Sequence, residues 1–196
     1  MRRSDSGLAF VDVIVATATL VVLSAMAVPV IGGVHDHARV RAAARYLSAR
    51  LHVARLEALR RNTAVGLRFD DEAEGYGFRL YSDGDADGVL QRDIDAGIDR
   101  PIDELDRIDH HFGDITFRVN AAVPDVGGGD ELAAASDPVR IGRTRFVSFN
   151  PLGGCTSGTL FIAGARGPQA AVRLLGQTGR IRTLWFDRQN RRWRED

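Results

Sequence analysis

The hydrophobic pattern divides the chain into three parts. The first is almost uniformly apolar from Leu8 to Val34, with one charged side chain, Asp12, in 27 residues. As a helix rising about 1.5 Å per residue, this segment would be roughly 40 Å long. That exceeds the roughly 30 Å hydrocarbon core of a bilayer. The pattern therefore predicts a transmembrane helix over residues 8–34, behind a short leader of residues 1–7.

The second part, residues 35–62, has the period of an amphipathic helix. Six apolar residues recur at intervals of three and four, which places them on one side of a helix. These residues are Val40, Ala44, Leu47, Leu51, Ala54 and Ala58. No strong breaker other than Gly32 and Gly33 separates this part from the first. We therefore expect one long helix, bent near Pro29, because proline removes a backbone donor and clashes with the preceding turn.

The third part, residues 63–196, has a period of two. Apolar and polar residues alternate in short runs separated by Gly-rich breaks, which predicts strands. The expected strands are residues 64–69, 76–81, 115–119, 139–149, 159–163, 170–175 and 180–186. Short strands with tight connections form antiparallel sheets. The predicted fold class is α+β, with a long N-terminal helix packed on an antiparallel β-sheet domain.

The first residues of the chain resemble a prepilin signal. Gly7 is followed by the apolar Leu8, by an acid at Asp12 and then by an unbroken apolar helix. In prepilins a peptidase cleaves after the glycine and methylates the new N-terminus, here Leu8. The acid then pairs with the N-terminal amine of a neighbouring subunit. Pro29 stands where the family often has a helix-kinking proline, although the family usually has Phe and Glu where this chain has Leu8 and Asp12.

The C-terminal half carries a second resemblance. The runs F-N-P-L-G (149–153), S-G-T-L (157–160) and G-R-I-R (179–182) occur in the order of the GspH/FimT domain. This resemblance implies a pilin-like fold and a minor pseudopilin, a structural subunit of a type II secretion pseudopilus or type IV pilus. The implied partners are other pilins or pseudopilins, a prepilin peptidase and the inner membrane. No cofactor is implied.

The resemblance also implies a location. The chain would cross the bacterial inner membrane once, with the basic leader residues Arg2 and Arg3 keeping the N-terminus cytoplasmic, and with the globular domain in the periplasm before assembly into the fibre. An alternative is a secretory signal peptide cleaved after Ala27, which would release a soluble β-domain protein. Asp12 and the apolar continuation through Val34 count against that alternative.

Charge is balanced overall but segregated along the chain. Residues 70–114 contain fifteen acidic residues and four Arg, whereas residues 140–196 contain eleven Arg and three acids. Arg180 and Arg182 are two residues apart, so on a strand they share one face and could contact successive phosphates. Some FimT-like minor pilins bind DNA through a C-terminal G-R-x-R element, so a DNA-binding minor pilin is the alternative function. In the other interpretation, these arginines are ordinary outward-facing strand residues that pair with the acidic loop region of this or the next subunit.

One acidic run has the spacing of a metal loop. Asp83, Asp85 and Asp87, followed by Gly88, match the opening of a calcium-binding loop. The twelfth position is Ile94 rather than the bidentate glutamate that such loops use. We therefore favour a solvated acidic loop over a calcium site.

Nothing in the sequence indicates catalysis. It contains no G-x-S-x-G elbow and no P-loop. The single Cys155 rules out an intramolecular disulfide, and the adjacent His110 and His111 would point to opposite faces of a strand. We expect neither an enzyme nor a cofactor.

Overall fold

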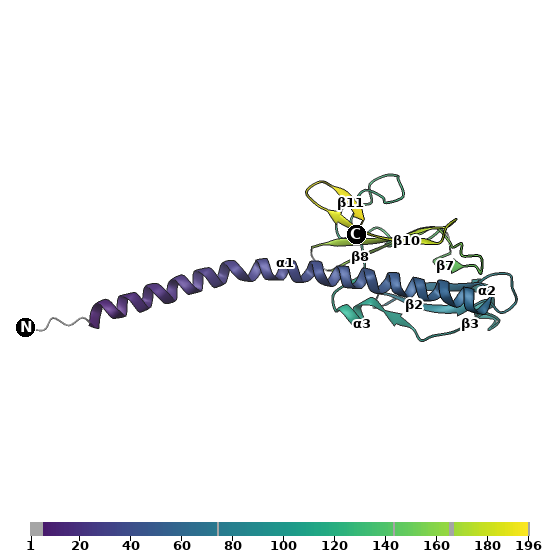
Figure 1. Ribbon diagram of the computed structural model, residues 1–196, viewed down its shortest axis with the longest axis horizontal. Helices are drawn as coiled ribbons and strands as arrows, with labels where there is room; N and C mark the ends of the chain where they lie inside the picture. Colours follow the sequence, from purple (N-terminus) through teal and green to yellow (C-terminus); the bar gives the residue numbers. More distant parts are fainter. Residues whose placement is uncertain (1–5, 74, 143, 165–166, 196) are drawn as a thin grey trace, which may run out of the picture.

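One helix dominates the structure. The computed structural model describes residues 6–73, 75–142, 144–164 and 167–195; the side chains of residues 6–9 and 25–34 lie outside this description. Helix α1 runs without interruption from Ser6 to Arg61. Its N-terminal half extends away from the domain and curves gently (Figure 1). The backbone stays helical through Pro29 and both following glycines, so the proline does not interrupt the helix.

The described strands form two antiparallel sheets. Sheet A has the order β3–β2–β1–β7, with β4 also paired to β2. Its strands are β1 (Val65–Glu72), β2 (Gly75–Ser82), β3 (Arg100–Pro101), β4 (Asp106–Arg107) and β7 (Phe146–Phe149). Sheet B has the order β11–β10–β9–β8–β5, with β6 paired to β8. Its strands are β5 (Thr116–Phe117), β6 (Val139–Arg140), β8 (Gly158–Ala163), β9 (Gln169–Leu175), β10 (Arg180–Asp187) and β11 (Arg192–Glu195). The α+β class and the antiparallel pairing agree with the prediction.

The C-terminal half of α1 contributes to the core. In Figure 1, strands β8 and β10 of sheet B lie on one side of the helix and strands β2 and β3 of sheet A on the other. Seven residues on one side of α1 are almost fully buried: Val40, Ala43, Ala44, Leu47, Leu51, Ala54 and Ala58. The same apolar core contains Phe69 and Phe78 of sheet A, and Leu160 and Val172 of sheet B. The four alanines let the helix backbone approach both sheets closely.

The prediction of one strand over residues 139–149 is wrong. These residues form two strands in different sheets, because β6 pairs with β8 and β7 pairs with β1. Between them, Gly142 and Arg145 have φ angles of +48° and +53°. This left-handed backbone cannot continue an extended strand. The apolar residues on the two sides of the break, at 139, 141, 147 and 149, keep the same phase, which is why the sequence suggested a single strand.

The acidic segment contains two short helices that the sequence did not predict, α2 (Gln91–Asp95) and α3 (Ile108–Phe112). A polar cluster holds the end of this segment against α1. Asp106 accepts a hydrogen bond from the Tyr46 hydroxyl, and its Oδ1 lies 2.8 Å from His111 Nε2. Burial alone would raise the pKa of Asp106, but hydrogen bonds from Tyr46, His111 and the Arg107 N–H hold it below its usual range. Burial and the hydrogen bond to Asp106 raise the pKa of Tyr46 to about 12.

Asp106→Asn is expected to lower the free energy of unfolding by about 1–3 kcal/mol near neutral pH, because charge-assisted hydrogen bonds are lost. The pKa of Asp106 is lower in the folded than in the unfolded chain. Its contribution is therefore complete above the unfolded value of about 3.9 and is lost as the pH falls through the folded value. In urea unfolding, the difference between wild type and variant should shrink below about pH 4.

Glu104→Gln is the matched control, because Glu104 is an exposed acid two residues away. Glu104→Gln should change the free energy of unfolding little, both near neutral pH and below about pH 4. A difference between wild type and Asp106→Asn that is unchanged in acid would contradict the proposed role of the Asp106 carboxylate.

Candidate functional site

The N-terminal half of α1 has a solvent-exposed apolar surface. Between residues 10 and 23 of the described chain, nine large apolar side chains are 49% to 67% exposed. They are Phe10, Val11, Val13, Ile14, Val15, Leu20, Val21, Val22 and Leu23. Two hydroxyls in this segment are satisfied within the helix, since Thr17 donates to the Val13 carbonyl at 2.9 Å and Thr19 to the Val15 carbonyl at 2.7 Å. This surface is therefore suited to an apolar environment.

Asp12 lies on this apolar surface. Its side chain is exposed, and the described residues provide no partner for it. Gly7 and Leu8 fall in the first turn of α1 and Pro29 in its middle, and the side chains of these residues lie outside the description. The structure therefore leaves the predicted processing and assembly roles of these residues as predictions.

The predicted membrane span, residues 8–34, also includes side chains that lie outside the description. Across the part of the chain that is described, no helix combines the length and apolar character that a membrane crossing requires.

Arg180 and Arg182 lie side by side on β10 and share one carboxylate. Arg182 Nε donates to Glu195 Oε1 at 2.8 Å, its Nη2 pairs with the other oxygen, and Arg180 Nη2 is 3.4 Å from Oε1. These hydrogen bonds lower the pKa of Glu195 and raise that of Arg182. Glu195 comes from the neighbouring strand β11 and partly neutralises the pair. The acidic loop does not supply this carboxylate.

The aromatic residues near these arginines are mostly packed. The Trp193 ring lies 5.8 Å from that of Phe161 and 5.2 Å from that of Phe186, and its Nε1 donates to the Pro124 carbonyl at 2.7 Å. Stacking of a base on Trp193 would require these contacts to break.

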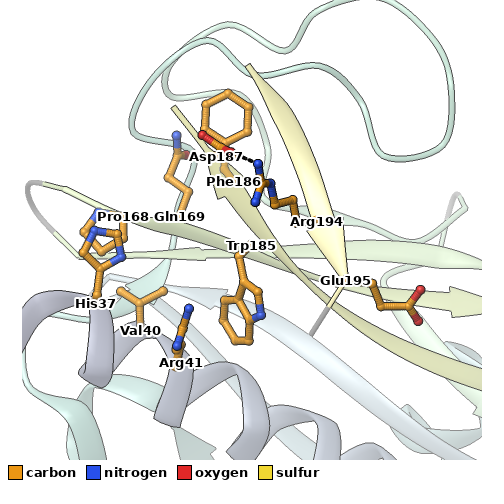
Figure 2. Close-up of a pocket in the computed structure, with 10 residues that line it drawn as sticks. All are labelled: His37, Val40, Arg41, Pro168, Gln169, Trp185, Phe186, Asp187, Arg194 and Glu195. Atoms are coloured by element: carbon orange, nitrogen blue, oxygen red, sulfur yellow. Dashed lines mark ion pairs between the residues drawn. The ribbon is translucent and has the colours of Figure 1, made fainter. Parts of the chain in front are cut away.

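Trp185 belongs to a groove between α1 and sheet B. Figure 2 shows its indole beside Arg41, whose guanidinium carbon is 5.4 Å from the ring centroid. The groove has a volume of about 350 Å³ and is also lined by His37 and Arg194. The Asp187 carboxylate forms an ion pair with the Arg194 guanidinium, with Oδ2 and Nη2 2.8 Å apart. Positive and negative side chains therefore balance each other around this groove.

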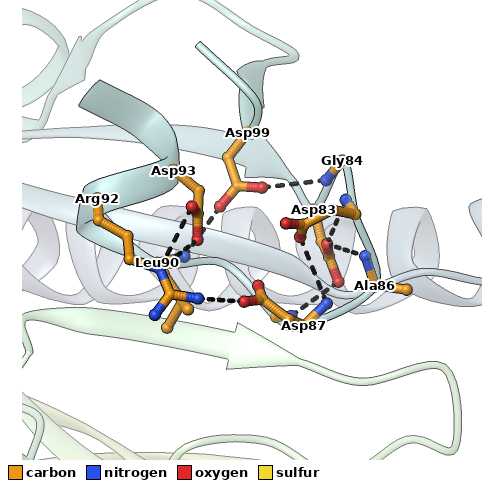
Figure 3. Close-up of polar contacts among 10 residues, drawn as sticks. Asp83, Gly84, Ala86, Asp87, Leu90, Arg92, Asp93 and Asp99 are labelled. Carbon is orange, nitrogen blue, oxygen red and sulfur yellow. Dashed lines mark hydrogen bonds and ion pairs between the residues drawn. The ribbon is translucent and has the colours of Figure 1, made fainter. Parts of the chain in front are cut away.

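The loop after β2 is organised around two buried aspartates (Figure 3). Asp83 accepts hydrogen bonds from the backbone N–H groups of Asp85, Ala86 and Gly88 at 2.7 to 3.1 Å. Asp99 accepts from the N–H groups of Gly84 and Leu90 at 3.0 and 2.9 Å. The loop therefore closes on Asp99, which the calcium-loop pattern did not single out.

The three predicted metal-binding aspartates do converge. Carboxylate oxygens of Asp83, Asp85 and Asp87 lie within 4.8 Å of one another. Both oxygens of Asp83, however, already accept backbone N–H groups, and Asp87 pairs with Arg92. Desolvation and the adjacent Asp85 raise the pKa of Asp87. This geometry is that of a loop held by its own carboxylates, and a metal role for these residues stays a prediction.

The sequence from residue 43 to residue 179 matches the family described as type II transport protein GspH. This match spans well over half of the chain. The chain belongs to the GspH family. No curated protein and no solved structure matched the chain.

Membership of the GspH family makes the chain a GspH/FimT-type pseudopilin, with a role in type II secretion or a pilus and with other pseudopilins as its associates. GspH proteins are structural and not an enzyme family. Cys155 is consistent with this, because burial raises the pKa of its thiol and so disfavours the reactive thiolate.

The GspH match covers only some of the predicted site residues. It includes the aspartates of the loop at residues 83–88, whereas Gly7, Leu8, Asp12 and Pro29 precede it and the two arginines of β10 follow it. No sequence pattern pointed to Asp99 or Glu195, because each acts through a pairing that only the folded chain creates.

Asp83→Ala is expected to lower the free energy of unfolding by about 2–3 kcal/mol, since three backbone N–H groups lose their acceptor. Asp85→Ala is the control and should change it by about 0.5 kcal/mol or less, because that side chain is exposed. Urea unfolding measures both. An equal effect of the two substitutions would contradict this account of the loop. Stabilisation of the wild type by calcium that Asp85→Ala abolishes would instead support a metal site.

Proposed function

We propose that this chain is a minor pseudopilin that joins a type II secretion pseudopilus or a type IV pilus through its N-terminal helix. One observation carries the proposal: a GspH-family domain is continuous with a helix whose first half exposes apolar side chains and one acid, Asp12. Such a surface has no stable place in water. Packing among similar helices in a fibre would bury it, as in the pilin architecture that the prepilin-like N-terminus resembles.

Before assembly the helix would reside in the bacterial inner membrane. The apolar run over residues 8–34 and the internally bonded threonine hydroxyls support this location. Arg2 and Arg3 favour a cytoplasmic N-terminus, which leaves the two sheets in the periplasm. Prepilin peptidase would then cleave after Gly7 and methylate Leu8.

Asp12 would supply the electrostatic contact of assembly. A lone carboxylate in hydrocarbon costs about 2.5–3.5 kcal/mol, so a partner of opposite charge is needed. The amine created at Leu8 of a neighbouring subunit is such a partner. Because Asp is one methylene shorter than the usual Glu, the two helices must approach more closely.

Asp12→Ala is expected to reduce the amount of the chain in sheared fibres at least tenfold, because the amine of the neighbour loses its counter-charge. Asp12→Glu should retain incorporation. Quantitative immunoblotting of fibre and membrane fractions measures both. Equal incorporation of wild type and Asp12→Ala would refute the pairing.

Mass spectrometry of the mature N-terminus is the accompanying control. A methylated chain beginning at Leu8 is expected for wild type and for both variants, which shows that the effect lies after cleavage. A chain beginning at Val28 would support the alternative of a signal peptide removed after Ala27, and so a secreted soluble protein.

A second candidate function is DNA binding by β10 during uptake. The two guanidinium groups of Arg180 and Arg182 converge on one carboxylate, and their side chains are 66% and 36% exposed. They are therefore close enough together to contact neighbouring phosphates. Glu195 competes with any phosphate for them.

This candidate predicts that Glu195→Gln strengthens DNA binding and that Arg180→Ala/Arg182→Ala weakens it. The double substitution should also reduce the slope of log affinity against log salt by about two. Gel shifts of the purified chain at several salt concentrations test both outcomes. Binding that neither variant changes would exclude β10 as the DNA site.

A further inference from the structure

Leu152 is the most exposed large apolar side chain of the described residues. It is 95% exposed, and it lies in the turn between β7 and β8. An apolar side chain held in water at this level is unfavourable unless a partner covers it. Leu152 belongs to the F-N-P-L-G motif, and nothing in the isolated chain explains why an apolar residue of that motif is so exposed.

The turn that carries Leu152 is rigid. Asn150 Oδ1 accepts hydrogen bonds from the N–H groups of Leu152 and Gly154, both at 3.0 Å. The Asn150 N–H in turn donates to the Gly154 carbonyl at 3.0 Å. The turn also packs closely against Gly179: a Cβ atom added at Gly179 would clash with the Gly153 carbonyl oxygen. The backbone that carries Leu152 is therefore held by the turn, so little backbone entropy is lost when a partner binds it.

The surroundings of the turn are basic. Arg55 Nη1 donates to the Gly179 carbonyl at 3.2 Å, and Arg55 also reaches Gly153. Arg180 follows Gly179 directly and is 66% exposed, and its contact with Glu195 Oε1 is a long one, at 3.4 Å. The Leu152 turn, residues 150–154, is therefore an apolar projection with guanidinium groups beside it.

The chain also contains an apolar groove, on the outer face of sheet A, that could receive an apolar projection such as the Leu152 turn. It has a volume of about 530 Å³. One wall is the segment Gly88–Gln91, and the other is formed by Thr144, Phe146, Ser148 and Thr156. Val89 and Phe146 belong to one small apolar cluster, in which Val89 lies against Gly66 of β1. This Val89 groove can accept a leucine side chain with part of its turn.

The margin of the Val89 groove is acidic. Asp85 and Asp87 are exposed and lie three residues and one residue before Gly88, and the ion pair with Arg92 involves Asp87 and not Asp85. The Val89 groove, which has acids beside it, is thus complementary to the Leu152 turn, which has arginines beside it. Charge complementarity of this kind fixes the orientation of an interface and speeds association.

We propose that the Leu152 turn of one copy of this chain docks in the Val89 groove of a second copy, with Arg55 and Arg180 facing Asp85 and Asp87. The contact involves only the folded domain and goes beyond assembly through the N-terminal helix. It would make neighbouring copies touch laterally through their domains.

Cross-linking of single-cysteine chains tests this contact. In full-length chains in detergent, with Cys155→Ser removing the native thiol, one copy carries Leu152→Cys and a differently tagged copy carries Gln91→Cys. Gln91 is exposed and lines the groove. We expect the mixed disulfide to form at least tenfold more than with Ala134→Cys, an exposed control position in a distant loop. Equal yields with Gln91→Cys and Ala134→Cys would overturn the proposal.

Leu152→Asp provides an independent measurement, because a side chain this exposed can be replaced without unfolding the domain. Sedimentation of the tagged chains should show self-association weakened at least tenfold, with unchanged circular dichroism. Unweakened association would also overturn the proposal. A chain that enters fibres in an Asp12-dependent way but gives no Leu152–Gln91 product refutes the domain contact alone. A chain that gives the product but never enters fibres refutes assembly through the helix alone.

Discussion

The burial of one stripe of α1 between two sheets is the contact on which the rest of the domain depends. Neither sheet has a complete core without it, because Leu47 and Leu51 lie in the same apolar cluster as Phe69 of sheet A and Val172 of sheet B. Each such side chain contributes about 1.5–3 kcal/mol when fully buried. The same helix continues as the exposed stalk, so the element that holds the fold together is also the one that reaches outside it.

The segregation of charge along the sequence becomes a segregation in space. The acidic segment supplies part of sheet A and its connections, whereas the basic C-terminal segment supplies much of sheet B, and α1 runs between them (Figure 1). Ion pairs from the helix to the acidic side, such as Arg39 with Asp114 and Arg50 with Asp103, secure that side. Such an arrangement favours contacts in which oppositely charged segments of two subunits meet.

Sequence patterns predicted the elements whose periodicity is regular. The stripe through Leu47 and Leu51 follows from spacing alone, and β1, β2, β8, β9 and β10 lie close to their expected bounds. The break at Gly142 was missed because the apolar residues before and after it share one phase. Helices α2 and α3 were missed because they are too short to show a period. In the candidate site, Glu195 and Asp99 could not be identified, since each meets its partners only through a strand register or a loop closure.

The unbroken course of α1 has a geometrical consequence for any assembly it enters. An α-helix turns through about 100° per residue. Because no hinge interrupts the helix between Ser6 and Arg61, the azimuth of the Leu152 turn around the helix axis is set by the number of residues in the stalk. Loss of a single residue there would swing every face of the domain by more than a quarter of a revolution. Stalk length thereby becomes a determinant of angular phase as well as of reach.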